Sequence, residues 1–187
     1  MKTLHTQQSR SLLGGLPWTS SAVTFRNFGD EAAALRKMVD HCSADLALKE
    51  FTLNVLHKAG AGSRQELDQA LAIGEWAQQN IYYVHEGRET FQRPETTLRL
   101  RAGDCDDFTI LIASMLGTIG IRNKLCILKI EGRWAHIFPV AVVVQGGESH
   151  RLTLDATLDK DRYPIRDLVN PIAIIKARGQ RVEPLFV

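Results

Sequence analysis

One cysteine of this sequence has neighbours that suit a reactive thiol. Cys105 follows Gly103 and Asp104 and begins an amphipathic run, which predicts a loop-to-helix junction. A thiol with a pKa of about 8.5 is a poor nucleophile, but a helix N-terminus favours the thiolate. Gly103 permits a tight turn, and Asp104 can cap the helix. The spacing therefore predicts a nucleophile, and the same helix N–H groups could hold the oxyanion of a tetrahedral intermediate.

The acidic neighbours of this thiol impose a requirement. Asp104, Asp106 and Asp107 would raise the pKa of Cys105, so an imidazolium must outweigh them if the thiolate is to form. His136 is the best candidate, because it lies in an otherwise apolar and aromatic run where a histidine is partly desolvated and held by a rigid strand.

A carboxylate follows one expected strand later. Asp155 lies opposite to Leu154 in the alternation of its strand, and antiparallel pairing can bring it beside His136. A carboxylate there would set the imidazole tautomer and support the imidazolium. The predicted catalytic order along the chain is therefore Cys105, His136 and Asp155.

The elements that must position these groups begin, along the chain, with helices. Apolar spacing predicts helices that begin after Asp30, after Ser43 and after Ser63, the last with Glu66 in a capping box, and a fourth helix over about 105–118. Gly60 and Gly62 end the second helix, and Gly120 stops the fourth. We interpret the polar segment 85–103 as turns.

Strands follow the helices. Period-two alternation predicts strands at 81–84, 124–130, 134–144 and 151–155, and one or two more in the tail 169–187. This order predicts an α+β domain rather than a repeated βαβ unit. We expect an N-terminal arm over 1–29 and a single domain over 30–187.

Composition narrows the classes of function. The chain of 187 residues is 44% hydrophobic and 24% charged, as in ordinary globular proteins, and its net charge of +2 does not favour nucleic acid as a partner. No apolar stretch approaches the roughly 20 residues of a membrane span, and the N-terminus lacks a convincing signal peptide, so we expect a cytoplasmic protein. Three cysteines without a CxxC pair favour neither a disulfide framework nor a zinc site.

Three separated motifs resemble the transglutaminase-like superfamily. The segment 98–121 resembles its nucleophile motif, which is Gly-Asp-Cys-acidic, an apolar helix and then Gly-Ile. Trp134-Ala-His136 resembles its histidine strand, and Leu154-Asp-Ala-Thr157 resembles its Leu-Asp-Pro-Thr motif, with Ala156 in place of the proline. Segments 81–84 and 89–98 also resemble a subfamily common in bacterial and tailed-phage genomes. The resemblance covers roughly residues 30–160.

The resemblance implies a papain-like core in which the cysteine helix packs on an antiparallel sheet that carries the histidine and the aspartate. The resemblance also implies that a thiol attacks an amide or peptide bond and forms a thioester, with neither a metal nor an organic cofactor. If water attacks the thioester, the protein is a protease or amidase, and its small size favours this outcome. If an amine attacks, the protein is a protein-glutamine crosslinking transglutaminase. We expect a protein or peptide substrate.

Other interpretations stay open at this stage. Tyr83 and Gln92 are candidate hydrogen-bond donors to the oxyanion, and the acidic trio around Cys105 could instead hold a divalent cation. The protein could also be a phage accessory or morphogenesis component that binds without turnover, in a host cytoplasm or a virion, or a metal-dependent hydrolase with histidine and aspartate ligands. Cys42 and Cys126 are interpreted as structural.

Overall fold

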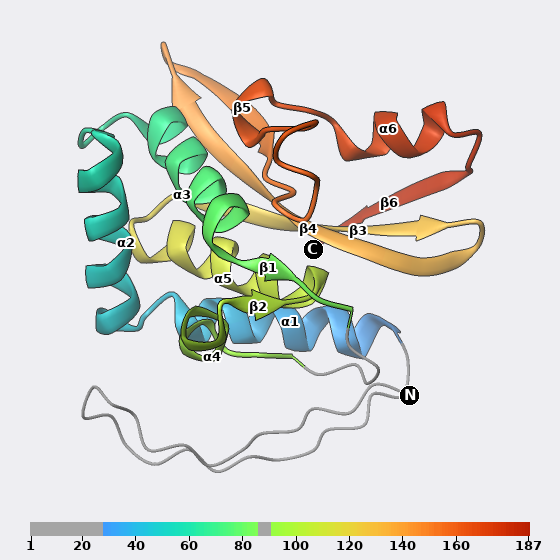
Figure 1. Ribbon diagram of the computed structural model, residues 1–187, viewed down its shortest axis with the longest axis horizontal. Coiled ribbons are helices and arrows are strands. Elements are labelled where there is room, and N and C mark those ends of the chain that lie inside the picture. Colours follow the sequence, from blue (N-terminus) through green and yellow to red (C-terminus); the bar gives the residue numbers. More distant parts are fainter. Residues whose placement is uncertain (1–27, 86–90) are drawn as a thin grey trace.

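The computed structural model describes residues 28–85 and 91–187, so the expected arm lies outside the described residues up to residue 27. The chain folds as an α+β protein, and Figure 1 shows α1 to α5 gathered beside one twisted sheet. The helices are α1 (Phe28–Cys42), α2 (Leu46–Ala59), α3 (Glu66–Asn80), α4 (Pro94–Leu100), α5 (Cys105–Thr118) and α6 (Pro171–Ala177), with a 3-10 turn at Ile165–Asp167. The strands are β1 (Tyr82–Tyr83), β2 (Ala102–Gly103), β3 (Arg122–Ile130), β4 (Arg133–Gln145), β5 (Glu148–Thr153) and β6 (Val182–Phe186).

The main sheet is antiparallel, in the order β5-β4-β3-β6. Its two faces bury different sets of side chains. Leu125, Ile127 and Ile137 pack with α1 and α5, whereas Cys126 and its neighbours on the other face pack with Ile172 and Ile175 of α6. Both faces of the central strands are therefore covered, as their nearly continuous apolar sequence requires.

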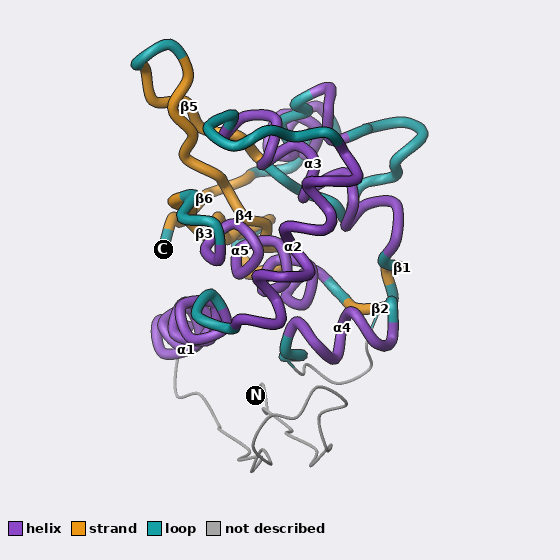
Figure 2. The backbone as a smooth tube through the Cα atoms, turned by 90° about the vertical axis from the view of Figure 1, so that its left-hand side faces the viewer, coloured by secondary structure: helices purple, strands orange, loops and turns teal. Residues whose placement is uncertain are grey.

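A short parallel pair, β1 with β2, lies apart from the main sheet. Tyr82 faces Ala102 and Tyr83 faces Gly103 in its register, and Figure 2 shows this pair beside α4. The pairing fixes the end of α3 against the turn that precedes α5. It thereby brings Tyr83 close in space to the start of the cysteine helix.

The central element is α5, which is apolar on nearly every side. Its residues from Asp106 to Leu116 are all buried, because α1, α2 and α3 pack around it and the sheet closes the remaining side. A helix that is hydrophobic all round belongs in a core. The expected fourth helix, over 105–118, is confirmed.

The start of α5 is held by a reciprocal capping box. The Asp104 carboxylate accepts hydrogen bonds from the N–H groups of Asp106 (3.0 Å) and Asp107 (3.5 Å). In return, the Asp107 carboxylate accepts one from the N–H of Asp104 (3.2 Å) and a further one from that of Gln92 (2.7 Å). The capping role expected of Asp104 is confirmed, and it satisfies donors that the helix itself leaves open.

Two expected helix caps are wrong. Helix α1 begins at Phe28, so Asp30 lies inside its first turn. Asp45 caps α2 with hydrogen bonds to two backbone N–H groups, whereas the Ser43 hydroxyl donates to the carbonyl of Val39, 2.7 Å away. Ser43 therefore bonds back to the last turn of α1 and does not cap α2.

The expected capping box of the third helix is wrong too. Helix α3 begins at Glu66, three residues after Ser63, and Gln65 at its N-cap makes no side-chain cap bond. The carboxylate of Glu66 instead accepts a hydrogen bond from the N–H of Val144 at the end of β4 (2.7 Å). A contact with the sheet has replaced the local contact that the sequence predicts.

The sequence also hides two short helices. Both α4, in the segment interpreted as turns, and α6, in the tail, begin with a proline in the first turn. Proline is tolerated there because its missing N–H has no partner inside the helix. The expected strands 124–130 and 134–144 are confirmed, as is a strand in the tail, but β5 ends at Thr153, so Asp155 lies just beyond it. Among the described helices, none is long and apolar enough to cross a lipid bilayer.

Gly117 near the end of α5 allows close contact with the α1–α2 turn. A Cβ at this position would lie 2.6 Å from the Cβ of Ser43. We expect Gly117→Ala to reduce the free energy of unfolding by about 1–3 kcal/mol through overpacking, as measured by urea denaturation.

The same substitution in a Ser43→Gly background is the matched control. The clash is then absent, and alanine is a better helix former than glycine by up to about 1 kcal/mol. The change should therefore stabilise the protein in that background. An equal loss of stability in both backgrounds would contradict the packing that places α5.

Candidate active site

His136 and Asp155 form a close side-chain pair. The Nε2 atom of His136 lies 2.7 Å from Oδ2 of Asp155. His136 lies on β4, opposite Leu128 of β3. Its side chain is 18% exposed and that of Asp155 only 1%. An aspartate so deeply buried needs partners for its charge, and the imidazole is one of them.

The other carboxylate oxygen of Asp155 is held by Thr157. The Thr157 hydroxyl donates to Oδ1 at 2.6 Å, and its backbone N–H donates to the same oxygen at 3.3 Å. The Leu-Asp-Ala-Thr segment thus fixes its own aspartate through a tight local turn, and alanine in place of the proline leaves this arrangement intact. Asp155 therefore presents a single, oriented oxygen to His136.

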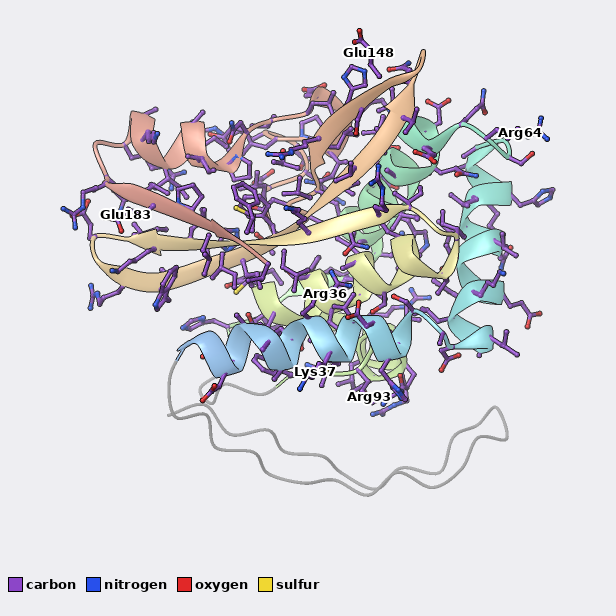
Figure 3. The ribbon with its side chains drawn as sticks, turned by 180° about the vertical axis from the view of Figure 1, so that it is seen from behind. Arg36, Lys37, Arg64, Arg93, Glu148 and Glu183 are labelled. Atoms are coloured by element: carbon purple, nitrogen blue, oxygen red, sulfur yellow. The ribbon has the colours of Figure 1, made fainter. Side chains whose placement is uncertain are left out.

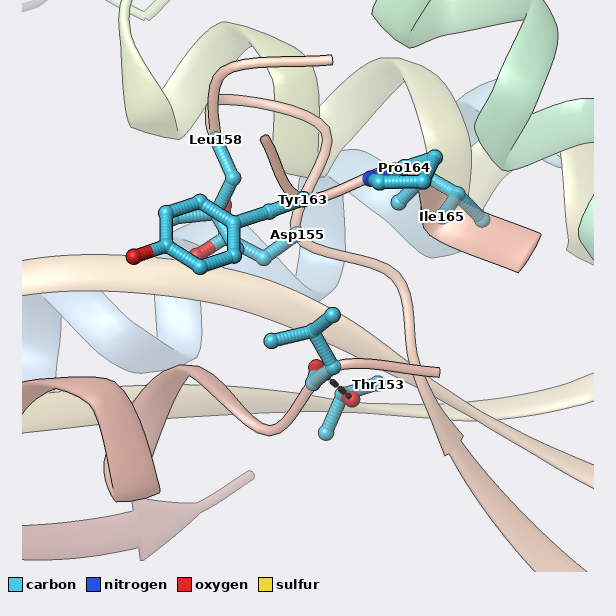
Figure 4. Close-up of a pocket in the computed structure, with 7 residues that line it drawn as sticks. Thr153, Asp155, Leu158, Tyr163, Pro164 and Ile165 are labelled. Carbon is cyan, nitrogen blue, oxygen red and sulfur yellow. Dashed lines mark hydrogen bonds between the residues drawn. The ribbon is translucent and has the colours of Figure 1, made fainter. Parts of the chain in front are cut away.

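The loop after Asp155 covers the carboxylate. Figure 4 shows the Tyr163 ring beside Asp155 in a small hollow that Thr153 and Leu158 also line. Gln78 of α3 anchors this loop, because its amide nitrogen donates to the carbonyls of Leu158 and Tyr163 at 3.0 Å each. The cover keeps water away from the carboxylate and strengthens its bond to the imidazole.

This pairing determines which nitrogen of His136 can meet a thiol. An ionised carboxylate only accepts hydrogen bonds, so Nε2 carries the donated proton and Nδ1 is left for the reacting group. Burial lowers the pKa of His136, but the charge of Asp155, its hydrogen bond and the charge of Asp106 outweigh burial and raise that pKa above 6.5. The two aspartates therefore shift the titration of His136 towards the imidazolium form.

Cys105 is the first residue of α5 and is partly buried. Its sulfur lies 3.9 Å from Oδ1 of Asp106. One turn later, the Thr109 hydroxyl lies 2.7 Å from the carbonyl oxygen of Cys105 and 3.2 Å from that of Ile137. Because Ile137 directly follows His136, this hydroxyl ties the start of the cysteine helix to the histidine strand.

The three supporting residues expected from the sequence lie around the start of α5. The Tyr83 ring is 6.5 Å from that of Phe108, and the pKa of its phenol is raised by burial and then by the charges of Cys105 and nearby aspartates. Tyr83 thus lies within electrostatic reach of the cysteine. Gln92 is attached through its backbone N–H to Asp107.

The expectation that the first N–H groups of the cysteine helix hold the oxyanion is wrong for two of these groups, because Asp104 binds them. Its carboxylate occupies the N–H groups of Asp106 and Asp107, so these two donors are not available to a tetrahedral intermediate. The capping box stabilises the helix at the expense of that role. A donor to the oxyanion must therefore come from other groups.

Sequence reasoning missed two threonines that shape this site. Thr109 is a fully buried polar residue one turn after the cysteine. A polar residue within an otherwise apolar run was the feature of the sequence that could have identified it. Thr157 was visible only as part of a motif. The described residues contain no group of three or more histidine, cysteine, aspartate or glutamate side chains arranged to hold a metal ion.

Comparison with known families places this geometry in context. Residues 51–157, more than half of the chain, match the family model of the transglutaminase-like domain, and the match includes Cys105, His136 and Asp155. The chain belongs to the transglutaminase-like domain family. No curated protein is similar enough to the chain to count as a match.

Solved structures resemble this transglutaminase-like chain in fold. A candidate protease from Parabacteroides distasonis is 14% identical with a TM-score of 0.50 and aligns with 82% of this chain and 39% of its own. A candidate cysteine protease from Cytophaga hutchinsonii is 20% identical with a TM-score of 0.42 and aligns with 59% of this chain and 37% of its own. The transglutaminase-like chain thus spans less than two fifths of either protein. The match at a TM-score of 0.50 supports the α+β, papain-like architecture expected from the sequence.

The three thiols of this transglutaminase-like domain should differ sharply in reactivity. Burial raises the pKa of Cys42 to about 11 and that of Cys126 to about 12, whereas Cys105 is only partly buried. We expect iodoacetamide at neutral pH to alkylate Cys105 at least about tenfold faster than either other cysteine, because only thiolates react. Peptide mapping by mass spectrometry measures the three rates.

His136→Ala should slow the alkylation of Cys105 and leave the other two rates unchanged. His150→Ala, at an exposed position on β5, is the matched control and should change none of them. Equal rates for all three thiols in the folded protein would contradict a special role for Cys105.

Proposed function

We propose that the chain is a cysteine-dependent amidase or peptidase in which Cys105 is the nucleophile, His136 the general base and acid, and Asp155 the residue that orients the histidine. The observation that carries this proposal is the 2.7 Å contact between His136 Nε2 and Asp155 Oδ2. His136 lies on β4, and the Thr109 hydroxyl joins this strand to the start of the cysteine helix. A raised pKa of His136 supports a thiolate–imidazolium pair despite the aspartates nearby.

The proposed reaction has two halves. The Cys105 thiol passes its proton to Nδ1 of His136, and the thiolate attacks the amide carbonyl carbon to give a tetrahedral oxyanion. Collapse breaks the C–N bond, and the imidazolium gives its proton to the leaving amine, which leaves a thioester on Cys105. Water then gives a proton to His136 and attacks the thioester. The second collapse breaks the C–S bond, releases a carboxylic acid and returns the thiol.

Tyr83 is our candidate for the oxyanion donor. Its phenol lies within electrostatic reach of Cys105 and Asp155, and the pairing of Tyr83 with Gly103 holds its backbone two residues from the nucleophile. The capping box already uses two helix N–H groups, so a side-chain donor fills a need at this site. Because burial and negative neighbours raise the phenol pKa, the phenol keeps its proton for donation.

The test is an amide-cleavage assay on a peptide library, with mass spectrometry of the products. We expect Cys105→Ala and His136→Ala to reduce kcat/KM by at least about 10⁴-fold and Asp155→Asn by about 10³–10⁴-fold. Tyr83→Phe should cost about 10²–10³-fold in kcat, since it removes one oxyanion donor. The His150→Ala variant should keep full activity.

Adding a primary amine distinguishes hydrolysis from acyl transfer. The proposal predicts that free acid remains the main product, while a crosslinking enzyme would yield the amine adduct. Cleavage that survives Cys105→Ala, or a Cys105 that alkylates rapidly while no amide in the library is cleaved, would overturn the proposal. The second result would favour a binding or assembly role.

A further inference from the structure

A second surface, remote from the candidate site, gathers positive charge around an open hollow of about 930 Å³. The hollow extends from α1, past the turn after α5, to the first residues of β3 and across to β4 and β5. Figure 3, which shows the molecule from behind, labels Arg36 on α1, and this residue is one of those that line the hollow. Cys105 is at the opposite end of α5, and a helix of 14 residues is about 21 Å long.

Three exposed cations line the hollow in a regular arrangement. Arg122 of β3 faces Val142 of β4, which in turn faces Arg151 of β5. Residues in register share a face of the sheet, so the two arginines flank Val142 across about 10 Å. Lys124, two residues after Arg122, lies on the same face. We call these three residues, Arg122, Lys124 and Arg151, the basic row.

The basic row is not neutralised within the described chain. None of its three side chains makes an ion pair with another described residue. Arg36 and Asp40, which also line the hollow, are paired with each other at 2.7 Å, and Arg36 also donates to the side chain of Asn123 at 2.9 Å. The hollow therefore combines a neutral, fixed wall with three like charges that repel one another.

We propose that this basic row is a docking surface for an acidic peptide segment of a partner or substrate protein. Charge complementarity selects an anionic occupant, and the volume has room for several residues. Among the described residues, no aromatic side chain on which a base could stack lines the hollow, which disfavours single-stranded nucleic acid. Residues 1–27 of the chain itself hold three lysines and arginines and no acidic residue, so this segment is not complementary.

The proposal does not depend on the reaction assigned to Cys105. A segment bound at the far end of α5 leaves the thiol accessible, and binding can be measured in a Cys105→Ser variant that cannot cleave. Failure of docking would leave the proposed reaction standing, and failure of the reaction would leave docking standing.

The experiment measures fluorescence anisotropy of the full chain carrying Cys105→Ser with a labelled peptide of repeating Glu-Ser, about eight residues long. We expect binding that weakens as salt rises from about 0.05 M to about 0.3 M, because exposed charges are screened. A peptide of repeating Gln-Ser should not bind. The triple variant Arg122→Thr, Lys124→Thr and Arg151→Thr should weaken binding by about tenfold or more, as expected for three surface ion pairs.

A matched variant removes three charges elsewhere. Lys49→Ser, Lys58→Ser and Lys176→Ser leave the same net charge as the triple variant, at exposed positions on α2 and α6, and should bind like the parent. If the triple variant fails to fold, amide chemical shifts of the parent must change at the basic row when the peptide is added. Equal losses in both variants, shifts elsewhere, or tighter binding of a single-stranded oligonucleotide of equal charge would overturn the proposal.

Discussion

The contact between the buried Asp155 carboxylate and the His136 imidazole is the interaction on which the candidate site depends. Burying a carboxylate is costly unless its oxygens are bonded, and here the imidazole holds one oxygen while Thr157 holds the other. The same charge and hydrogen bond of Asp155 raise the pKa of His136. The stabilisation from the pair is complete below about pH 6.5, the unfolded value, and is lost as pH rises through the higher folded pKa.

The rest of the fold holds the start of the cysteine helix against the strand that carries His136. The capping box fixes the direction in which α5 begins, and the Thr109 hydroxyl joins that beginning to the strand beside His136. Gln78 holds the loop that shields Asp155. The bonds from Thr109 to the Ile137 carbonyl and from Gln78 to the loop link segments that are far apart in the chain. The arrangement therefore belongs to the packing of helices against the sheet and to no single motif.

Much of this could be predicted from the sequence, because the signals were local. The apolar run after Asp104 predicted α5 and its cap, and alternation predicted the strands that carry His136 and lead to Asp155. The cap expected from Ser43 failed because its hydroxyl bonds back to the Val39 carbonyl, four residues earlier. The capping box expected from Ser63 and Glu66 failed because the Glu66 carboxylate accepts from the N–H of Val144 on the sheet. Local sequence cannot reveal partners across the fold.

The same limit applies to the fine structure of the site. The use of the first helix N–H groups by Asp104 follows from cap geometry, which a one-dimensional pattern shows only as a preference. Short helices such as α4 and α6 carry too few turns for a clear period, and only their initial prolines mark them. The basic row likewise arises from strand register, since Arg122 and Arg151 are neighbours only across β4.

The most direct test of the central claim is an NMR titration of the His136 ring in the parent and in Asp155→Asn. We expect the pKa of His136 in the parent to lie above 6.5, because Asp155 and Asp106 outweigh burial. In the variant, burial opposes only the charge of Asp106, so the pKa of His136 should fall. A pKa of His136 that is the same in both proteins would contradict the account.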